Sequence, residues 1–287
     1  ENPNKIAIAT INGNTIIYKD LLQLVDIIAF NLKINIKPPQ SKIALHLDNS
    51  IELFAISIAI SKLNLIAIPL ITSLIPEQVR LALISTGTDL LITSNHFFLK
   101  FTDLASSIFP KHFVKVLKLG DITKPSGYVL NTNTALSSNP NSSSPIDGSY
   151  IITLSSGSTG RPKPIVLSQG SKIKRFLQAK KLFNVKSNDV ILCASPFYHS
   201  LGQRLTFLPL LNGCTLVYLD SFSPQKWISA VKQFNVTFTI PVVSHLQTLR
   251  QALLDNIEDL TSLRCIVSSS STIGYELKSA LLNKLRC

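Results

Sequence analysis

Short apolar segments alternate with longer amphipathic segments along almost the whole chain. The short segments are rich in Ile, Val and Leu, as buried strands are. In the longer segments apolar residues recur every three or four positions, as in a helix that packs against a sheet. Such alternation is typical of parallel sheets whose strands are joined by crossover helices. The pattern predicts an α/β fold of layered αβα subdomains with mostly parallel sheets.

The first predicted unit is a hairpin of Ile6–Ala9 and Thr15–Ile17, because Asn12-Gly13 between them readily supplies the positive φ angles of a tight turn. The other expected strands are 42–47, 65–69, 89–93, 150–154, 164–167, 189–194, 215–219, 236–240 and 264–267. The expected helices are 21–32, 50–63, 76–85, 171–182, 201–211, 224–233, 242–254 and 275–285.

Residues 121–149 break this alternation. The segment contains Pro125, Pro140 and Pro145 among many Ser, Asn and Thr residues, and it has few side chains that could be buried. We therefore expect a surface linker here.

The composition is that of a folded protein and narrows the possible partners. The 287 residues are 45% hydrophobic and 15% charged, enough for one large core or two modest ones. No uncharged apolar run reaches the roughly 18 residues that span a bilayer, and Glu1–Asn4 does not resemble a signal sequence, so we expect a cytoplasmic protein without a transmembrane segment. The net charge is +12, but the basic residues are scattered, so nucleic acid is not an expected partner.

The four cysteines have no paired spacing, and three of them lie in apolar segments that resemble buried strands. They are Cys193, Cys214, Cys265 and Cys287. Neither a disulfide framework nor a zinc site follows from this pattern, and we predict no metal-ligating residues.

A polar loop rich in glycine and hydroxyl groups directly follows the strand expected at 150–154. Its glycines allow close approach of the backbone, so that successive N–H groups can point at an anion, and its hydroxyl and cationic side chains add donors and charge. The expected phosphate-binding residues are Ser155, Ser156, Gly157, Ser158, Thr159, Gly160, Arg161 and Lys163. The glycine spacing does not fit a Walker loop. On composition alone, a flexible polar connector is the alternative.

The stretch from Ile152 to Lys163 resembles the AMP-binding signature of the adenylate-forming superfamily, which includes acyl-CoA synthetases, luciferases and peptide-synthetase adenylation domains. Three further segments resemble markers of this family in the same order along the chain, namely Thr15–Leu21, Lys62–Leu70 and Pro196–Gly202. The resemblance covers the whole chain and implies a partial large N-terminal domain. We expect 1–65 with 185–287 to form one αβα subdomain and 66–184 the other.

The segment Pro196-Phe197-Tyr198-His199-Ser200-Leu201-Gly202 is similar to the Pro-x-x-His-x-x-Gly segment of acyl- and aryl-CoA ligases. In that family the matching histidine lies beside the nucleotide and acyl pocket. The resemblance thus implies that His199 is a catalytic residue that helps to place the carboxylate. We assign no function to the other four histidines, His46, His96, His112 and His245.

The segment around Ser268, Ser269 and Ser270 resembles the strand and glycine-rich turn that line the adenine and acyl pocket of relatives. We expect these serines to contribute to the nucleotide site. They stand where relatives carry glycines, so their Cβ atoms would narrow the pocket. Other departures are Asn64 for Gly and Pro164 for the Gly after the signature lysine.

The resemblance implies a ligase that uses ATP and Mg²⁺ to form an acyl-adenylate of a small carboxylic acid, such as a fatty acid, and then transfers the acyl group to CoA. An acyl-AMP ligase that loads an acyl carrier protein is one alternative, and a catalytically silent homologue is another. Relatives continue with a Mg²⁺-binding Glu, a ribose-binding Asp and a small C-terminal domain. The family pattern stops before these groups, so we expect the chain as given to bind nucleotide weakly and not to turn over.

Overall fold

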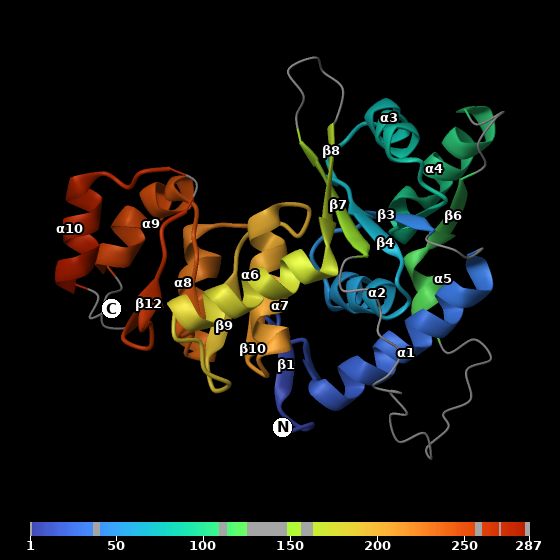
Figure 1. Ribbon diagram of the computed structural model, residues 1–287. Coiled ribbons are helices and arrows are strands. Elements are labelled where there is room, and N and C mark those ends of the chain that lie inside the picture. The colour runs from blue at the N-terminus through green and yellow to red at the C-terminus, as the bar shows by residue number, and fades with distance from the viewer. Residues whose placement is uncertain are drawn as a thin grey trace. The chain divides into compact units, whose positions relative to one another are not determined.

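A computed structural model describes residues 2–36, 41–108, 114–124, 148–155, 163–255, 260–269 and 271–284. The chain divides into two compact units (Figure 1). Unit 1 consists of Glu1–Leu21 and Arg175–Cys287, and unit 2 of Leu22–Lys174. Each unit contains one six-stranded sheet. The boundaries fall inside helices α1 (Tyr18–Asn35) and α6 (Gln169–Leu182).

The sheet of unit 1 has the strand order β12-β11-β9-β10-β1-β2. Its strands are β1 (Ile6–Thr10), β2 (Thr15–Ile17), β9 (Val190–Cys193), β10 (Thr215–Tyr218), β11 (Phe238–Thr239) and β12 (Cys265–Ile266). All neighbours are parallel except β1 and β2, which form the predicted antiparallel hairpin. Gly13 has φ +86° in the connecting turn.

The helices of unit 1 cover both faces of this sheet. They are α7 (Ser200–Leu211), α8 (Pro224–Phe234), α9 (Val243–Asp255) and α10 (Tyr275–Lys284). Along the sheet, the connection from β9 to β10 advances toward β1, whereas the connection from β10 to β11 returns toward β12. Because such crossovers are right-handed, their helices α7 and α8 lie on opposite faces of the sheet. One hydrophobic core of the unit lies under α8, α9 and α10, with Trp227, Leu249 and Leu277 among its members.

The sheet of unit 2 has the order β6-β5-β3-β4-β7-β8, and only β7 and β8 are antiparallel. The strands are β3 (Lys42–His46), β4 (Ile66–Pro69), β5 (Leu90–Thr93), β6 (Lys115–Lys118), β7 (Ser149–Ser155) and β8 (Lys163–Ser168). The helices are α2 (Ile51–Lys62), α3 (Pro76–Thr86), α4 (Asn95–Ile108) and α5 (Leu119–Thr123). Figure 1 shows α2 and α3 on opposite sides of the sheet.

Local sequence explains where several of these helices begin and end. The Ser50 hydroxyl accepts a hydrogen bond from the Leu53 amide at 3.1 Å and caps α2. Pro76 opens α3, where its missing N–H group is not needed, and Gly87 closes it in the left-handed conformation with φ +62°.

The predicted α/β fold is confirmed, and three elements were missed. These are α4 and β6, which precede the expected linker, and α5, which overlaps its first residues. The linker prediction of 121–149 was wrong at its ends, because Ile122 is fully buried in α5 and Ser149 begins β7. Residues 125–147 of that segment lie outside the described residues.

The two units differ from the predicted subdomains, which placed 1–65 with 185–287. Strand β3 lies within 1–65 but pairs with β4 and β5 of unit 2, and α2 contacts β4. Only the β1–β2 hairpin and the first residues of α1 belong with the later part of the chain. Pairing between strands, which local pattern does not reveal, determines this division.

None of the described helices is both long and apolar enough to cross a membrane.

Candidate active site

The predicted phosphate-binding loop connects the two strands of the β7–β8 hairpin. Ser155 pairs with Lys163 at the open end of the ladder, and residues 156–162 between them lie outside the described part of the chain. The backbone of Ser155 is therefore placed, as is Lys163, whereas Ser156, Gly157, Ser158, Thr159, Gly160 and Arg161 are not. The phosphate-binding role of these residues stays a prediction.

Strand β7 anchors this hairpin in the interior of unit 2. Tyr150 and Ile151 are buried, and the Tyr150 hydroxyl donates a hydrogen bond to the Ser57 carbonyl of α2 at 3.0 Å. Burial raises the pKa of Tyr150, so its hydroxyl remains a donor. Strand β8 has one partner and Lys163 is exposed at its start. A fixed strand thus leads into the loop, and an accessible cation follows it.

The second predicted segment, Pro196–Gly202, forms a compact turn between β9 and α7 of unit 1. The His199 amide donates to the Pro196 carbonyl at 3.1 Å, and the His199 carbonyl accepts from the Gln203 amide at 3.1 Å. A Cβ atom on Gly202 would lie 2.0 Å from the Pro196 oxygen, so only glycine fits there. The close contact explains the glycine at position 202, whereas the two hydrogen bonds use backbone atoms of Pro196 and His199 and do not depend on their side chains.

His199 is the N-cap residue of α7, and its side chain makes no capping hydrogen bond. The ring is exposed and lies edge-on to the Tyr198 ring, with 4.6 Å between the centroids. The covered part of the ring lowers the pKa of His199, because burial disfavours the charged imidazolium. A neutral, accessible imidazole can donate or accept a hydrogen bond at neutral pH.

The start of α7 carries positive charge. Arg175 of α6 donates to the Ser200 hydroxyl at 3.2 Å, and Arg204 follows one turn later in α7. Burial, together with the nearby charge of Arg175, lowers the pKa of Arg204. Two guanidinium groups and the helix N-terminus make the start of α7 favourable to an anion.

The carboxyl ends of parallel strands lie at one edge of a sheet, so the segments after β9, β10, β11 and β12 gather at the same edge of unit 1. His245 follows β11 and stacks on Phe222, which follows β10, with centroids 3.7 Å apart and planes 6° apart. The His245 Nδ1 atom is buried and has no partner among the described residues. His245 belongs to no recognisable sequence motif, and only the strand order could have indicated its position at this edge.

The two described pocket serines, Ser268 and Ser269, do not share one environment. The Ser269 amide donates to the Pro241 carbonyl at 3.2 Å, and its carbonyl accepts from the Val243 amide at 3.0 Å, which extends the parallel pairing beyond β12. Successive side chains of an extended strand point to opposite faces. Ser268 and Ser269 therefore face opposite sides of the sheet, and Ser270 lies outside the described residues.

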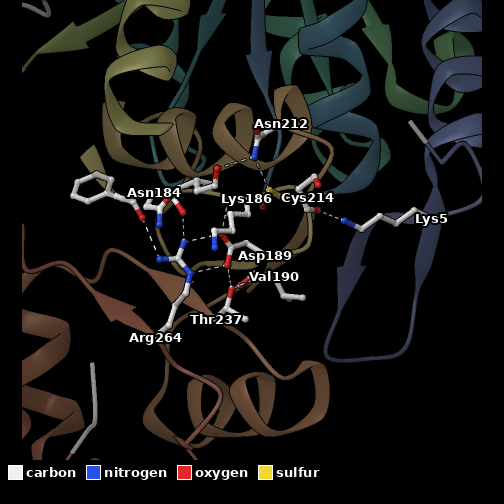
Figure 2. A network of polar contacts seen from close by, with 12 residues as sticks. Lys5, Asn184, Lys186, Asp189, Val190, Asn212, Cys214, Thr237 and Arg264 are labelled. Carbon is white, nitrogen blue, oxygen red and sulfur yellow. Dashed lines mark hydrogen bonds and ion pairs between the residues drawn. The ribbon is translucent and has the colours of Figure 1, made fainter. Parts of the chain in front are cut away.

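A polar network fixes the opposite, amino-terminal edge of the same strands (Figure 2). Asp189, just before β9, accepts two hydrogen bonds from Arg264, just before β12, at 2.8 and 2.6 Å. It also accepts from the Thr237 hydroxyl at 2.6 Å and from the Lys186 amide at 2.8 Å. Arg264 further donates to the carbonyls of Phe183 and Asn184 at 3.1 and 3.2 Å. The network joins β9, β11 and β12, whose far ends carry the candidate site.

Asp189 is ionised in this network. Burial alone would raise its pKa, but the hydrogen bonds from Arg264, Thr237 and the Lys186 amide outweigh burial and hold the pKa below its ordinary value. The carboxylate is 5% exposed and the guanidinium 35% exposed. Because its partners satisfy both carboxylate oxygens, this pair stabilises the arrangement of strands rather than offering a free reactive group.

No group of three or more potential metal ligands occurs among the described residues. Cys193 and Cys214 are buried, and Cys265 is partly buried; all three are free thiols. Burial raises the pKa of Cys193 to about 12, so its thiol is not a nucleophile at neutral pH.

Comparison with known sequences agrees with the motifs. A 4-coumarate–CoA ligase of Arabidopsis thaliana is 31% identical over 144 residues, which are 48% of this chain and 26% of that protein. A feruloyl-CoA synthase of Amycolatopsis is 29% identical over 140 residues, 48% of this chain and 28% of that protein. The aligned half of the chain thus spans between a quarter and a third of the length of these relatives.

Solved structures share the fold. ATP-bound MatB of Rhodopseudomonas palustris superimposes with a TM-score of 0.84 at 18% identity, over 100% of this chain and 56% of that one. The O-succinylbenzoate coenzyme A synthetase MenE of Bacillus subtilis, in complex with AMP, gives a TM-score of 0.79 at 19% identity, over 98% of this chain and 55% of that one. The model of the family described as AMP-binding enzyme matches residues 1–287. The chain therefore belongs to the AMP-binding enzyme family.

Proposed function

We propose that the protein activates a carboxylic acid with ATP, through an acyl-adenylate and with release of pyrophosphate, and then transfers the acyl group to CoA. Family membership over the whole chain supports this reaction, as do relatives named as CoA ligases. A fatty acid is the substrate that the sequence leads us to expect. The names of the relatives point equally to aryl carboxylates.

The turn between β9 and α7 is the observation that carries this proposal. It exposes a neutral His199 at the N-terminus of a helix whose first turns contain Arg204 and contact Arg175, at the edge of a parallel sheet where ligands generally bind. A carboxylate at this position would accept hydrogen bonds from the imidazole and gain from the positive charge. In the proposed reaction His199 places the carboxylate of the acid.

The β7–β8 loop would hold the phosphates of ATP. Lys163 is exposed at the end of that loop and offers a cation to the leaving pyrophosphate. Mg²⁺, when bound, would neutralise part of the phosphate charge. The residues of this chain would supply donors and orientation, since charge develops on the phosphates as pyrophosphate leaves.

Pyrophosphate exchange in the full-length protein tests the proposal. Lys163→Ala should lower the exchange rate by about 100-fold, the usual effect of removing one donor to developing charge. It should leave the unfolding temperature unchanged, because the side chain is exposed. Lys174→Ala, another exposed lysine, is the matched control and should keep the rate of the parent protein. Exchange at the parent rate in the Lys163 variant would refute the phosphate-binding role.

Two alternatives remain open within the family. An acyl-AMP ligase would transfer the acyl group to a carrier protein, so assays with CoA and with holo-carrier protein distinguish it. A catalytically silent homologue is favoured by the serines at 268–270, which stand where relatives have glycines. In that case neither ATP nor an acyl-adenylate analogue should change the unfolding temperature. The cytoplasmic location expected from the sequence remains a prediction.

A further inference from the structure

Helix α6 is strongly and uniformly basic (Figure 1). No Asp or Glu occurs from 163 to 188, a stretch that contains the whole helix. The basic residues of the helix are Lys172, Lys174, Arg175, Lys180 and Lys181. The Arg175 guanidinium is engaged with the Ser200 hydroxyl. The lysines therefore supply the charge that the proposed reaction does not use.

Two apolar side chains are exposed on the outer face of this helix. Ile173 and Leu177 are 41% and 55% exposed, and their spacing of four residues places them on the same face, one turn apart. The opposite face is covered, because Ala179, which points about 140° away from them, is only 5% exposed. Since α6 is one continuous helix, its own geometry fixes this arrangement.

Three lysines flank this apolar pair. At about 100° per residue, Lys180 lies on one side of the pair, whereas Lys181 and Lys174 lie on the other, all within about 80° of its centre. The three side chains are exposed, and none has an ion-pair partner in the described part of the chain. Together with Ile173 and Leu177 they form the α6 face, which has an apolar centre between cationic flanks.

An anionic lipid bilayer matches this combination of groups. Ammonium groups attract the headgroup phosphates, while apolar side chains between them enter the boundary between headgroups and acyl chains. Protein interfaces, by contrast, are enriched in aromatic residues and Arg and are depleted in Lys. Nucleic acid would engage the lysines but offers no apolar layer to Ile173 and Leu177. The charge and the apolar pair together thus favour a lipid surface.

We infer that the α6 face binds reversibly to the surface of an anionic phospholipid membrane, with the helix axis in the membrane plane and Ile173 and Leu177 turned toward the lipid. Each lysine near an anionic bilayer strengthens binding about 5-fold, so the three together contribute roughly 100-fold. Two apolar side chains add only a modest gain, which makes the association peripheral. The inference goes beyond the proposed ligase reaction, because the α6 face uses neither the His199 turn nor the β7–β8 loop.

Co-sedimentation of the full-length protein with phospholipid vesicles tests the inference. The protein should bind vesicles with about 30% phosphatidylglycerol at least 20-fold more tightly than vesicles of phosphatidylcholine alone. The double variant Lys180→Gln, Lys181→Gln should weaken this binding about 25-fold. The matched control Lys19→Gln, Lys33→Gln removes two exposed lysines of α1 and should bind like the parent protein.

The apolar pair needs its own variants, because adsorption by charge alone would not involve it. Leu177→Gln should weaken vesicle binding at least 3-fold. Leu99→Gln, at a leucine of α4 that is 73% exposed, is the matched control and should have no effect. In vesicles with brominated acyl chains, the added fluorescence of Leu177→Trp should be quenched and that of Leu99→Trp should not.

Pyrophosphate exchange without lipid separates this inference from the proposed reaction. The Lys180→Gln, Lys181→Gln variant should exchange at the rate of the parent protein, so a loss of vesicle binding would not reflect a damaged active site. The inference is overturned if the protein does not prefer anionic vesicles, or if the two double lysine variants bind equally. Binding that depends on the lysines but leaves Leu177→Trp unquenched also overturns it, and would indicate an acidic partner other than a bilayer.

Discussion

Gly202 offers a sharp test of how the candidate active site is built, since alanine at this position would collide with the turn that presents His199. The new Cβ atom would lie 2.0 Å from the Pro196 oxygen, 2.6 Å from its carbonyl carbon and 2.8 Å from the Ser195 oxygen, whereas ordinary contacts begin near 3.4 Å. All three atoms belong to the backbone and cannot rotate away. The start of α7 must therefore move by about 1 Å or more, which strains the hydrogen bond from His199 to Pro196.

The magnitude follows from two opposing effects. Overpacking of this kind destabilises by about 1–3 kcal/mol or more, and alanine gains up to about 1 kcal/mol over glycine inside a helix. We expect Gly202→Ala to lower the free energy of unfolding of unit 1 by about 2 kcal/mol, or the unfolding temperature by about 4–8 °C. Pyrophosphate exchange should fall further than stability explains, because His199 moves with the turn.

Fluorescence of Trp227 measures this change, because it is the single tryptophan of the chain and is fully buried in unit 1. Gly274→Ala is the matched control, since a Cβ atom there meets nothing within 4 Å, and it should alter stability by less than about 0.5 kcal/mol. Equal unfolding midpoints for the two variants would refute the packing argument. If Gly202→Ala is destabilised but exchanges pyrophosphate at the rate of the parent protein, the link between this turn and the function of His199 is refuted.

Three further predictions concern buried charge. Arg264→Met should lower the free energy of unfolding of unit 1 by about 2 kcal/mol in a urea titration, because it leaves the Asp189 carboxylate buried with fewer donors. Arg250→Met is the control, since it removes only the exposed ion pair between Arg250 and Glu276 at 4.0 Å. It should have almost no effect in the same titration. Asp189 has a lowered folded pKa, so its stabilising effect is complete above its ordinary value of 3.8 and is lost as the pH falls through the folded value. The difference in urea midpoint between the parent protein and Arg264→Met should therefore shrink as the pH is lowered from 6 to 2. A difference that stays constant over this range would contradict the prediction. Burial lowers the pKa of His46, so the unfolded chain binds a proton at a higher pH than the folded chain does. Unit 2 should therefore lose stability as the pH falls below 6.5. His46→Leu should abolish this loss, and amide hydrogen exchange in β3 measures it.

The fold could be predicted where local pattern determines structure. The hairpin at Gly13 and the helix that begins after Ser50 follow from turn and capping chemistry, and both are found. Strand β6 was missed because its four residues are only partly buried and include Lys115 and Lys118, which obscure any apolar run. The observed units differ from the expected subdomains because the division depends on which strands pair, and β1 pairs with β10 about 200 residues away.

The candidate site divides in the same way between local and nonlocal signals. The resemblance of Pro196–Gly202 to a segment of acyl- and aryl-CoA ligases drew attention to His199, and the structure explains Gly202 in this segment by a close backbone contact. His245 could not be found from sequence, because its place beside Phe222 depends on strand order. For Ser268 and Ser269, simple strand alternation could have shown that the two side chains face opposite sides.

The pairing of β1 with β10 also has a consequence for synthesis on the ribosome. Unit 2 is one continuous stretch, from Leu22 to Lys174, and can fold as soon as that stretch has emerged. Strand β1 is made earlier but must wait for β10, and at 5–20 residues per second this interval lasts roughly 10–40 s. Throughout it the hairpin has one edge exposed, and the Lys5 side chain lacks the Gly213 carbonyl that it later contacts. We expect nascent chains of this protein to be most vulnerable to aggregation, and most in need of a chaperone, during that interval.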